Sequence, residues 1–168
     1  FLAFEQILKN HGEGRERKTE IAQFDTIKAR RVAAANVKLY MNREDGFVGS
    51  SLRKDEFICD CSDLDDIIII RQDGKLIVTR IGEKTFVGKN IIHAAIWKKN
   101  DKHMVYNVIY YDGSTGISYA KRFSVTSIIR DREYDLTQGN ENSQLLYFTA
   151  NPNSESEMVM VNLHNSAK

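Results

Sequence analysis

The sequence has few cysteines, which cross-link a fold, and few prolines, which interrupt helices and strands. The 168 residues include two cysteines, Cys59 and Cys61, and one proline, Pro152. Two cysteines cannot form the disulfide framework of a small secreted domain, which favours a protein of the reduced cytoplasm. One proline together with ten glycines excludes collagen-like and proline-rich chains.

Long apolar runs are also missing. The strongest run is the four isoleucines of 67–70, far short of the ~20 residues that a membrane-spanning helix needs. No basic start is followed by an apolar stretch, so the sequence carries no secretory signal. Hydrophobic residues still make up 42% of the chain, too many for a wholly disordered protein. We expect one domain, or one domain with a tail, because domains usually have about 100–150 residues.

The formal net charge of +1 hides an uneven distribution along the chain. The segments 1–40, 71–104 and 105–132 carry +3, +5 and +2, whereas 41–70 and 133–168 carry −5 and −4. A basic middle between acidic flanks predicts an anionic partner for one face only. A mixed surface without such a partner is the alternative interpretation of the same charges.

The N-terminal segment has the pattern of a helix followed by a linker. Apolar residues of the first ten positions recur at helical spacing, and His11 with the glycines at 12 and 14 ends the pattern. The alanine-rich stretch 28–36 fits a short helix capped by Asp25 or Thr26, with a strand as the alternative because short helices are marginal. Since Phe1 is not methionine, we expect a piece of a longer chain.

From Val37 onward the sequence changes to a β pattern. Runs rich in β-branched and aromatic residues predict strands at Val37–Met41, Ile67–Ile70, Met104–Tyr111 and Leu145–Thr149. The turns that follow are Asp45-Gly46, Asp73-Gly74, Asp112-Gly113 and 151–154, and the partner strands are Phe47–Val48, Lys75–Ile81, Ile117–Phe123 and Glu157–Val161. Asp-Gly between apolar runs is a strong hairpin signal, because glycine accepts a positive φ.

The hairpins form an internal repeat. The turn glycines at 46, 74 and 113 are 28 and 39 residues apart, and a further 39 residues lead to Pro152. Repeats of this length favour a bladed architecture, with a β-sandwich as the alternative. The isoleucine run at 67–70 fits a strand buried on both faces between neighbouring blades. Only about three or four units fit after Val37, so we expect part of a wheel whose last edge is exposed or paired with another copy.

No arrangement of catalytic or metal-binding residues emerges. Cys59 and Cys61 would place both thiols on one face of a strand, and we interpret them as buried structural cysteines rather than half of a zinc site. The four aspartates between positions 60 and 66 lack the glycine and the terminal glutamate of a calcium loop and fit a solvated turn. We therefore expect no metal site and no independent enzyme activity.

The best candidate for a binding site is a series of basic residues in the middle of the chain. The predicted DNA-binding residues are Arg71, Lys75, Arg80, Lys84, Lys89, Lys98, Lys99, Lys121 and Arg122, with Lys102 in the same series. Contacts to phosphates need charge and reach rather than a fixed geometry. Arg71 and Lys75 flank a hairpin tip and are expected to be solvated, on a rim shared by successive blades. Alternatively, these charges only protect strand edges from pairing.

Four segments resemble the A subunits of bacterial type IIA DNA topoisomerases, namely topoisomerase IV and DNA gyrase, in their Bacteroidetes-like form. They are HGEGRERKTEI, NREDGFVGSSLRKDEFICDCSDLDDIIII, VGKNIIHAAIWKKNDK and KRFSVTSIIRDREYDLT. The resemblance implies that residues 1–36 are the end of a helix from the upstream breakage-reunion core and a linker. It implies that residues 37–168 are a partial C-terminal β-pinwheel, a mostly β disc of blades that exchange strands.

The resemblance also implies a function. In this family the pinwheel binds and bends duplex DNA around a basic rim and supports ATP-dependent strand passage by the whole isomerase. The implied partners are duplex DNA, the separate ATPase subunit of the enzyme and a second copy of the A subunit, at the nucleoid in the cytoplasm. The implied cofactors of the whole enzyme are Mg²⁺ and ATP, with none in this segment. The catalytic tyrosine lies upstream in the family, so none of the seven tyrosines is expected to be catalytic.

One motif separates two members of this family. The Gln-Arg-Arg-Gly-Gly-Lys-Gly box of gyrase A subunits is missing, since Val-Ala-Ala follows Arg30 and Arg31. The resemblance therefore implies the topoisomerase IV role, decatenation and relaxation. A protein-interaction propeller without a role on DNA is the alternative, which the acidic segments and the near-neutral total charge would suit.

Overall fold

The computed structural model describes residues 2–12 and 36–162. The chain divides into two units, Phe1–Val32 and Ala33–Lys168, each of which is described by itself. The linker and the short helix or strand predicted between residues 15 and 35 lie outside the described residues.

The first unit contains the predicted helix, α1 (Leu2–His11). Glu5 in the first turn and Lys9 in the last turn complement the helix dipole. The helix ends where the Gly12 amide donates to the Leu8 carbonyl oxygen, over 2.8 Å. Its apolar residues Phe4 and Leu8 are 78% and 75% exposed. No residue of the described part of this unit covers its apolar stripe.

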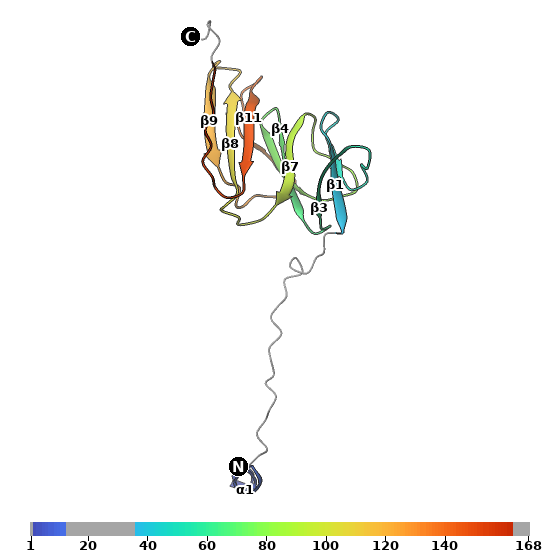
Figure 1. The fold of residues 1–168 in the computed structure, drawn as a ribbon, viewed down its shortest axis with the longest axis vertical. Helices are drawn as coiled ribbons and strands as arrows, with labels where there is room; N and C mark the ends of the chain where they lie inside the picture. Colours follow the sequence, from blue (N-terminus) through green and yellow to red (C-terminus); the bar gives the residue numbers. More distant parts are fainter. Residues whose placement is uncertain (1, 13–35, 163–168) are drawn as a thin grey trace. The chain divides into compact units, whose positions relative to one another are not determined.

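The second unit is built of strands in the described residues, which confirms the prediction of a mostly β fold. The strands are β1 (Val37–Asn42), β2 (Phe47–Gly49), β3 (Glu56–Cys61), β4 (Asp66–Arg71), β5 (Lys75–Arg80), β6 (Thr85–Phe86), β7 (Ile91–Trp97), β8 (Val105–Tyr111), β9 (Ser118–Phe123), β10 (Glu133–Asp135) and β11 (Gln144–Asn151). They form three antiparallel sheets, with strand orders β3-β1-β2-β6, β10-β5-β4-β7 and β11-β8-β9 (Figure 1). We call these the first, second and third sheets.

All three predicted Asp-Gly hairpins are present, and in each a glycine with positive φ closes the turn, four residues after the acceptor in the first and third and three residues after it in the second. The amides of Gly46, Gly74 and Gly116 donate to the carbonyl oxygens of residues 42, 71 and 112, over 3.0, 3.1 and 2.9 Å. These glycines have φ of 79°, 81° and 71°, which only glycine adopts without strain. In the third hairpin the left-handed residue is thus Gly116 and not the predicted Gly113. Gly113 is needed for another reason, because a Cβ there would lie 2.2 Å from the Glu141 carbonyl oxygen.

The sheets exchange strands with one another by a repeated rule. After the β4–β5 hairpin of the second sheet, the chain returns to the first sheet as β6 and pairs with β2. After the β8–β9 hairpin of the third sheet, it returns to the second sheet as β10 and pairs with β5. The residue following each exchanged strand donates its amide to the turn glycine of the receiving hairpin, Val87 to Gly46 over 2.9 Å and Leu136 to Gly74 over 2.8 Å. This exchange is compatible with the bladed architecture expected from the repeat.

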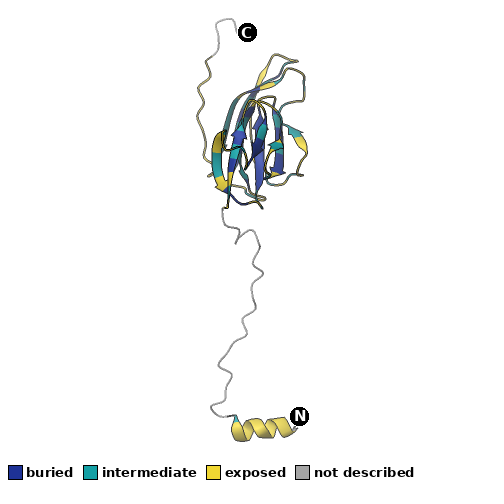
Figure 2. Cartoon of the chain, turned by 90° about the vertical axis from the view of Figure 1, so that its right-hand side faces the viewer, coloured by how far each residue is buried: buried dark blue, intermediate teal, exposed yellow. Residues whose placement is uncertain are grey.

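The core lies in two layers between the three sheets. Ile67 and Ile69 of β4 face the first sheet, and Ile68 and Ile70 face the third. All four are at most 1% exposed, so this strand is buried on both faces, as predicted. Figure 2 shows the buried strands at the centre of the second unit.

Other sequence expectations were wrong or incomplete. The expected partner strand Glu157–Val161 is not a strand, and this segment lies against the third sheet instead. The strands β6, β7 and β10 were not predicted. β6 and β10 have only two and three residues, and their partners belong to the preceding repeat, so local sequence carries little signal for them.

Candidate nucleic-acid interface

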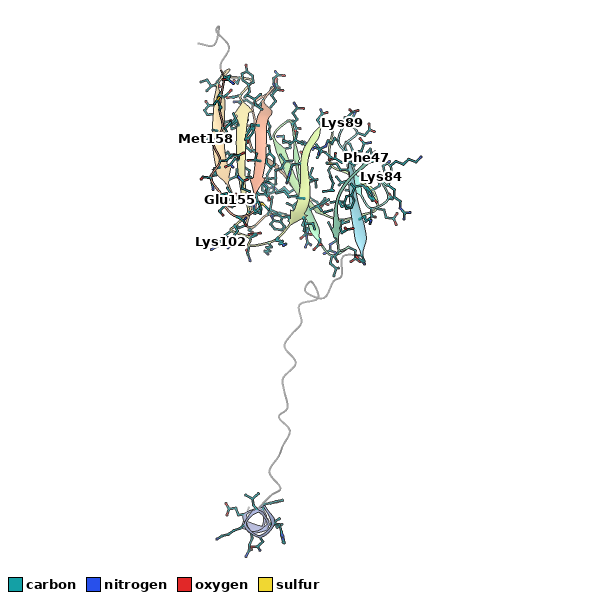
Figure 3. All side chains as sticks on the ribbon, in the orientation of Figure 1. Phe47, Lys84, Lys89, Lys102, Glu155 and Met158 are labelled. Carbon is teal, nitrogen blue, oxygen red and sulfur yellow. The ribbon has the colours of Figure 1, made fainter. Side chains whose placement is uncertain are left out.

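The predicted basic residues do not share one rim. The strands have a turn end, which holds the hairpin turns at 43–46, 72–74 and 112–117, and a distal end opposite to it. On the second sheet, Lys75 of β5 lies beside the turn, whereas Arg80 lies at the distal end of the same strand. In Figure 3, Lys89 and Lys102 lie at opposite ends of the second unit.

Arg71 is not the solvated hairpin-tip residue that the sequence suggested. It is 9% exposed. Its Nη1 donates to the Val87 carbonyl oxygen over 2.9 Å and to Glu133 over 2.5 Å, and its Nη2 pairs with Asp73 over 2.9 Å. These partners belong to the exchanged segment of the first sheet, to β10 and to its own turn. Arg71 therefore joins three successive repeats, and its charge is neutralised inside the fold.

Lys75 and Lys84 are also engaged. The Lys75 Nζ pairs with Asp135 of β10 over 2.5 Å. The Phe47–Phe86 ring pair takes the corresponding place in the first sheet. Lys75 and Phe47 are each the first residue after a hairpin turn, and each lies opposite a residue of the exchanged strand. Lys84 is exposed, with its Nζ 4.3 Å from the centroid of the Phe47 ring, as the labels of Figure 3 place it.

The distal end of the second sheet gathers several of the predicted residues. Arg80, Asp66 and Trp97 lie in one row across β5, β4 and β7. The loop after Trp97 carries the exposed Lys98, Lys99 and Lys102. Two hydrogen bonds hold this loop, from the Trp97 Nε1 to the Val125 carbonyl oxygen and from the Asn100 amide to the Thr126 carbonyl oxygen, both over 2.8 Å.

Lys121 and Arg122 follow each other on β9 and therefore point to opposite faces of the third sheet. The Lys121 Nζ donates to the Leu136 carbonyl oxygen over 2.7 Å, toward the second sheet. The Arg122 Nη2 donates to the Ser154 carbonyl oxygen over 2.8 Å, and the Ser154 hydroxyl donates to the His103 carbonyl oxygen. Arg122 thus borders the distal loop, whereas Lys121 does not.

Sequence reasoning missed Arg130, which also lies at the distal end. Its Nε is 2.8 Å from a carboxylate oxygen of Asp66, a residue that is 2% exposed. Asp66 belongs to the acidic cluster that was expected to be a solvated turn, so that interpretation is wrong for this member. A single basic residue 64 positions away from its partner leaves no sequence signal.

The two ends differ in charge. The turn end carries the carboxylates of Glu44, Asp45, Asp73, Asp135 and Glu141. Its Arg43, Arg71 and Lys75 are paired, whereas its Lys89 is exposed and makes no ion pair with described residues. At the distal end, by contrast, no ion pair of the described residues involves Arg80, Lys98, Lys99 or Lys102. We call these four exposed residues the distal basic surface.

The cysteines have the structural placement that was predicted. Cys59 and Cys61 lie opposite Leu39 and Val37 of β1, both on the core side of β3. Burial raises the pKa of the Cys61 thiol to about 11, with smaller contributions from Cys59 and nearby aspartates. The described residues contain no group of three or more histidines, cysteines or carboxylates that could hold a metal ion.

Comparison with known proteins shows the family to which the chain belongs. The family described as "Topoisomerase C-terminal domain, Bacteroidota" matches residues 38–168. The chain belongs to this family. The A subunit of DNA topoisomerase 4 from Borreliella burgdorferi is 30% identical over 147 residues, which cover 87% of this chain and 23% of that relative. No solved structure matches the chain.

These matches confirm the resemblance to the C-terminal region of type IIA topoisomerase A subunits. The chain spans about a quarter of the length of the curated relative that it matches. No helix in the described parts of the chain is both long and apolar enough to cross a bilayer.

Proposed function

We propose that this domain is the DNA-binding part of the A subunit of a type IIA topoisomerase and that it holds duplex DNA on its distal basic surface. The observation that carries the proposal is the separation of paired from unpaired charge. At the turn end Arg43, Arg71 and Lys75 are neutralised by the fold, and Lys89 is exposed. At the distal end Arg80, Lys98, Lys99 and Lys102 are all exposed and make no ion pair with described residues. Unpaired cations on a rigid surface are the groups that phosphates recruit.

The distal basic surface is suited to hold DNA without reading its sequence. Lysine and arginine side chains replace condensed counterions on phosphates, so binding depends steeply on salt and little on base sequence. The bonds from Trp97 and Asn100 fix the backbone that carries three of the four residues. A DNA segment bent along this surface would be presented to the cleavage core of the whole enzyme, which supplies the tyrosine, Mg²⁺ and ATP chemistry. The missing gyrase box supports decatenation and relaxation as the role.

Charge reversal tests the proposal. Changing Arg80, Lys98, Lys99 and Lys102 together to glutamate should weaken binding of random duplex DNA at least about a hundredfold and lower the salt slope by about three to four. The matched control reverses four other exposed basic residues, Lys9, Lys54, Lys84 and Lys89. It should change affinity much less, since those residues do not belong to the distal end. Equal effects of the two variants in a fluorescence titration would contradict the proposed surface.

A protein-interaction module is the second candidate, and one observation favours it. The outer face of the first sheet exposes Phe57 and Phe86 by 49% and 60%, next to Tyr40 and Phe47. Exposed aromatic clusters are typical of protein-binding surfaces. If the wild-type domain fails to bind duplex DNA at low salt, this candidate replaces the first.

A further inference from the structure

The third sheet lacks the strand that the exchange rule gives to the other two. β2 receives β6, and β5 receives β10, whereas no described strand pairs with the outer edge of β9. A Cβ on Gly46 would lie 2.3 Å from the Gly88 carbonyl carbon, and one on Gly74 would lie 2.5 Å from the Thr137 Cγ2. A Cβ on Gly116 would meet only the Tyr111 hydroxyl, at 3.8 Å. The third turn is therefore closed by a glycine like the others, but no described segment covers it.

The acceptor edge has defined features. Ile117 takes the place of Phe47 and Lys75, which face Phe86 and Asp135 across the sheet, and it is 53% exposed. Because Asp112 and Ile117 form a hydrogen-bonded pair, the amides of residues 118, 120 and 122 point away from β8. The edge thus offers free backbone groups and one apolar side chain to an incoming strand.

The C-terminal segment has the sequence of such a strand. Aligning Val161 with Val87 and Leu136 places Met160 opposite Ile117, Met158 opposite Tyr119 and Glu155 opposite Arg122. Met158 and Met160 are 97% and 85% exposed where they now lie, and Figure 3 shows Met158 at the flank of the third sheet. Pairing would bury both methionines, one beside an aromatic ring, and would match opposite charges. Asn162 would take the place of Gly88, and asparagine tolerates the left-handed conformation.

The segment cannot make this pairing in its own chain. Asn151 lies opposite Val105 on β8, and Arg122 lies opposite Asn107. From Asn151 to a residue paired with Arg122 is three strand spacings and two rows, about 16 Å. The four residue steps from Asn151 to Glu155 reach at most about 14 Å when fully extended, and they include a turn with Ser154 at φ 56°. Pairing over the whole of residues 155–161 therefore needs a donor from another molecule.

We propose that the β9 edge accepts residues 155–161 of a second copy of this chain, in an exchange between molecules. The move gives up the bonds of Glu157 to Asn107, Tyr147 and Thr149 on the donor's own third sheet and the bond between Ser154 and Arg122. It replaces them with a strand ladder and two buried methionines. This strand exchange does not rest on the DNA-binding function proposed above.

Mixed cysteine variants test the exchange. A full chain with Ile117→Cys mixed with a full chain with Met160→Cys should form an oxidised heterodimer of twice 19.3 kDa on a non-reducing gel, since directly opposed Cβ atoms lie about 5 Å apart. Val159→Cys is the matched control, because its side chain would point to the other face and should not cross-link. Ala120→Pro in the Ile117→Cys chain, which removes an outward amide but no β8 ladder bond, should abolish the cross-link.

Either of two results would overturn the proposal. A chain carrying both Ile117→Cys and Met160→Cys that closes its disulfide at monomer mass would make the pairing internal. No cross-link in the mixture, together with the monomer mass by light scattering of the wild-type chain at high concentration, would show that the edge stays open.

Discussion

Arg71 is the residue whose role changes most between sequence and structure. Its buried guanidinium joins Val87, Asp73 and Glu133. We therefore expect Arg71→Ala to lower the free energy of unfolding by about 2–4 kcal/mol, because two carboxylates and a carbonyl lose their common donor. Arg80→Ala, at an exposed position of the same sheet, should change it by less than about 0.5 kcal/mol. Urea denaturation of both variants checks this, and equal stabilities would mean that Arg71 does not join the repeats.

His93 gives the domain a predictable response to acid. It lies on β7 against the rings of Tyr106 and Phe148. Burial lowers its pKa to about 4, with a smaller contribution from the charge of Arg43. An unfolded histidine titrates near 6.5, so between about pH 6.5 and 4 the unfolded chain binds the extra proton. The contribution of His93 to the free energy of unfolding is therefore fully present above about pH 6.5. It is lost as the pH decreases toward 4, by up to about 3 kcal/mol.

Replacing the imidazole should remove that response. His93→Phe keeps an aromatic ring in the site and should flatten the stability curve between pH 6.5 and 4, as measured by urea midpoints across the range. The control is His103→Phe, which changes an exposed histidine and should leave the slope unchanged. An unaltered acid response in the His93 variant would show that another group causes it.

Among the elements, the exchanged strands hold the sheets together, and their contact with the turn glycines can be measured. Gly46 and Gly116 share a positive φ, so alanine is strained at both, by about 1 kcal/mol. Only at Gly46 would the new Cβ strike the exchanged segment, against the backbone of Gly88. Gly46→Ala should therefore cost clearly more stability than Gly116→Ala in thermal unfolding of dilute protein. Similar losses would argue against the tight exchange contact.

The elements also show which parts of the fold sequence reasoning could reach. The three Asp-Gly hairpins were predicted because their signal lies within a few adjacent residues. β6 and β10 were not, because each is defined by a hairpin of the preceding repeat rather than by its own composition. Residues 157–161 have the composition of a strand but do not form one, since in the described structure they lie against the third sheet rather than along a strand edge.

At the scale of the whole molecule, the near-zero net charge conceals a separation that only folding reveals. Charge counting along the sequence found the basic middle but placed Arg71 and Lys75 with Lys98 and Lys99. The fold divides them, because Arg71 and Lys75 flank the turn between β4 and β5, whereas Lys98 and Lys99 follow the distal end of β7. Pairing across the repeats then neutralises Arg71 and Lys75. The candidate surface could therefore be predicted in kind from the sequence, while its membership depended on tertiary contacts.

The most direct test of the DNA-binding surface is to map which lysines DNA protects in the unaltered protein. The full chain is acetylated with and without saturating random duplex DNA at low salt, and each lysine is quantified by mass spectrometry. The distal basic surface predicts strong protection of Lys98, Lys99 and Lys102, with Lys9, Lys54 and Lys89 reacting as in free protein. Protection of the second group without the first would contradict the account.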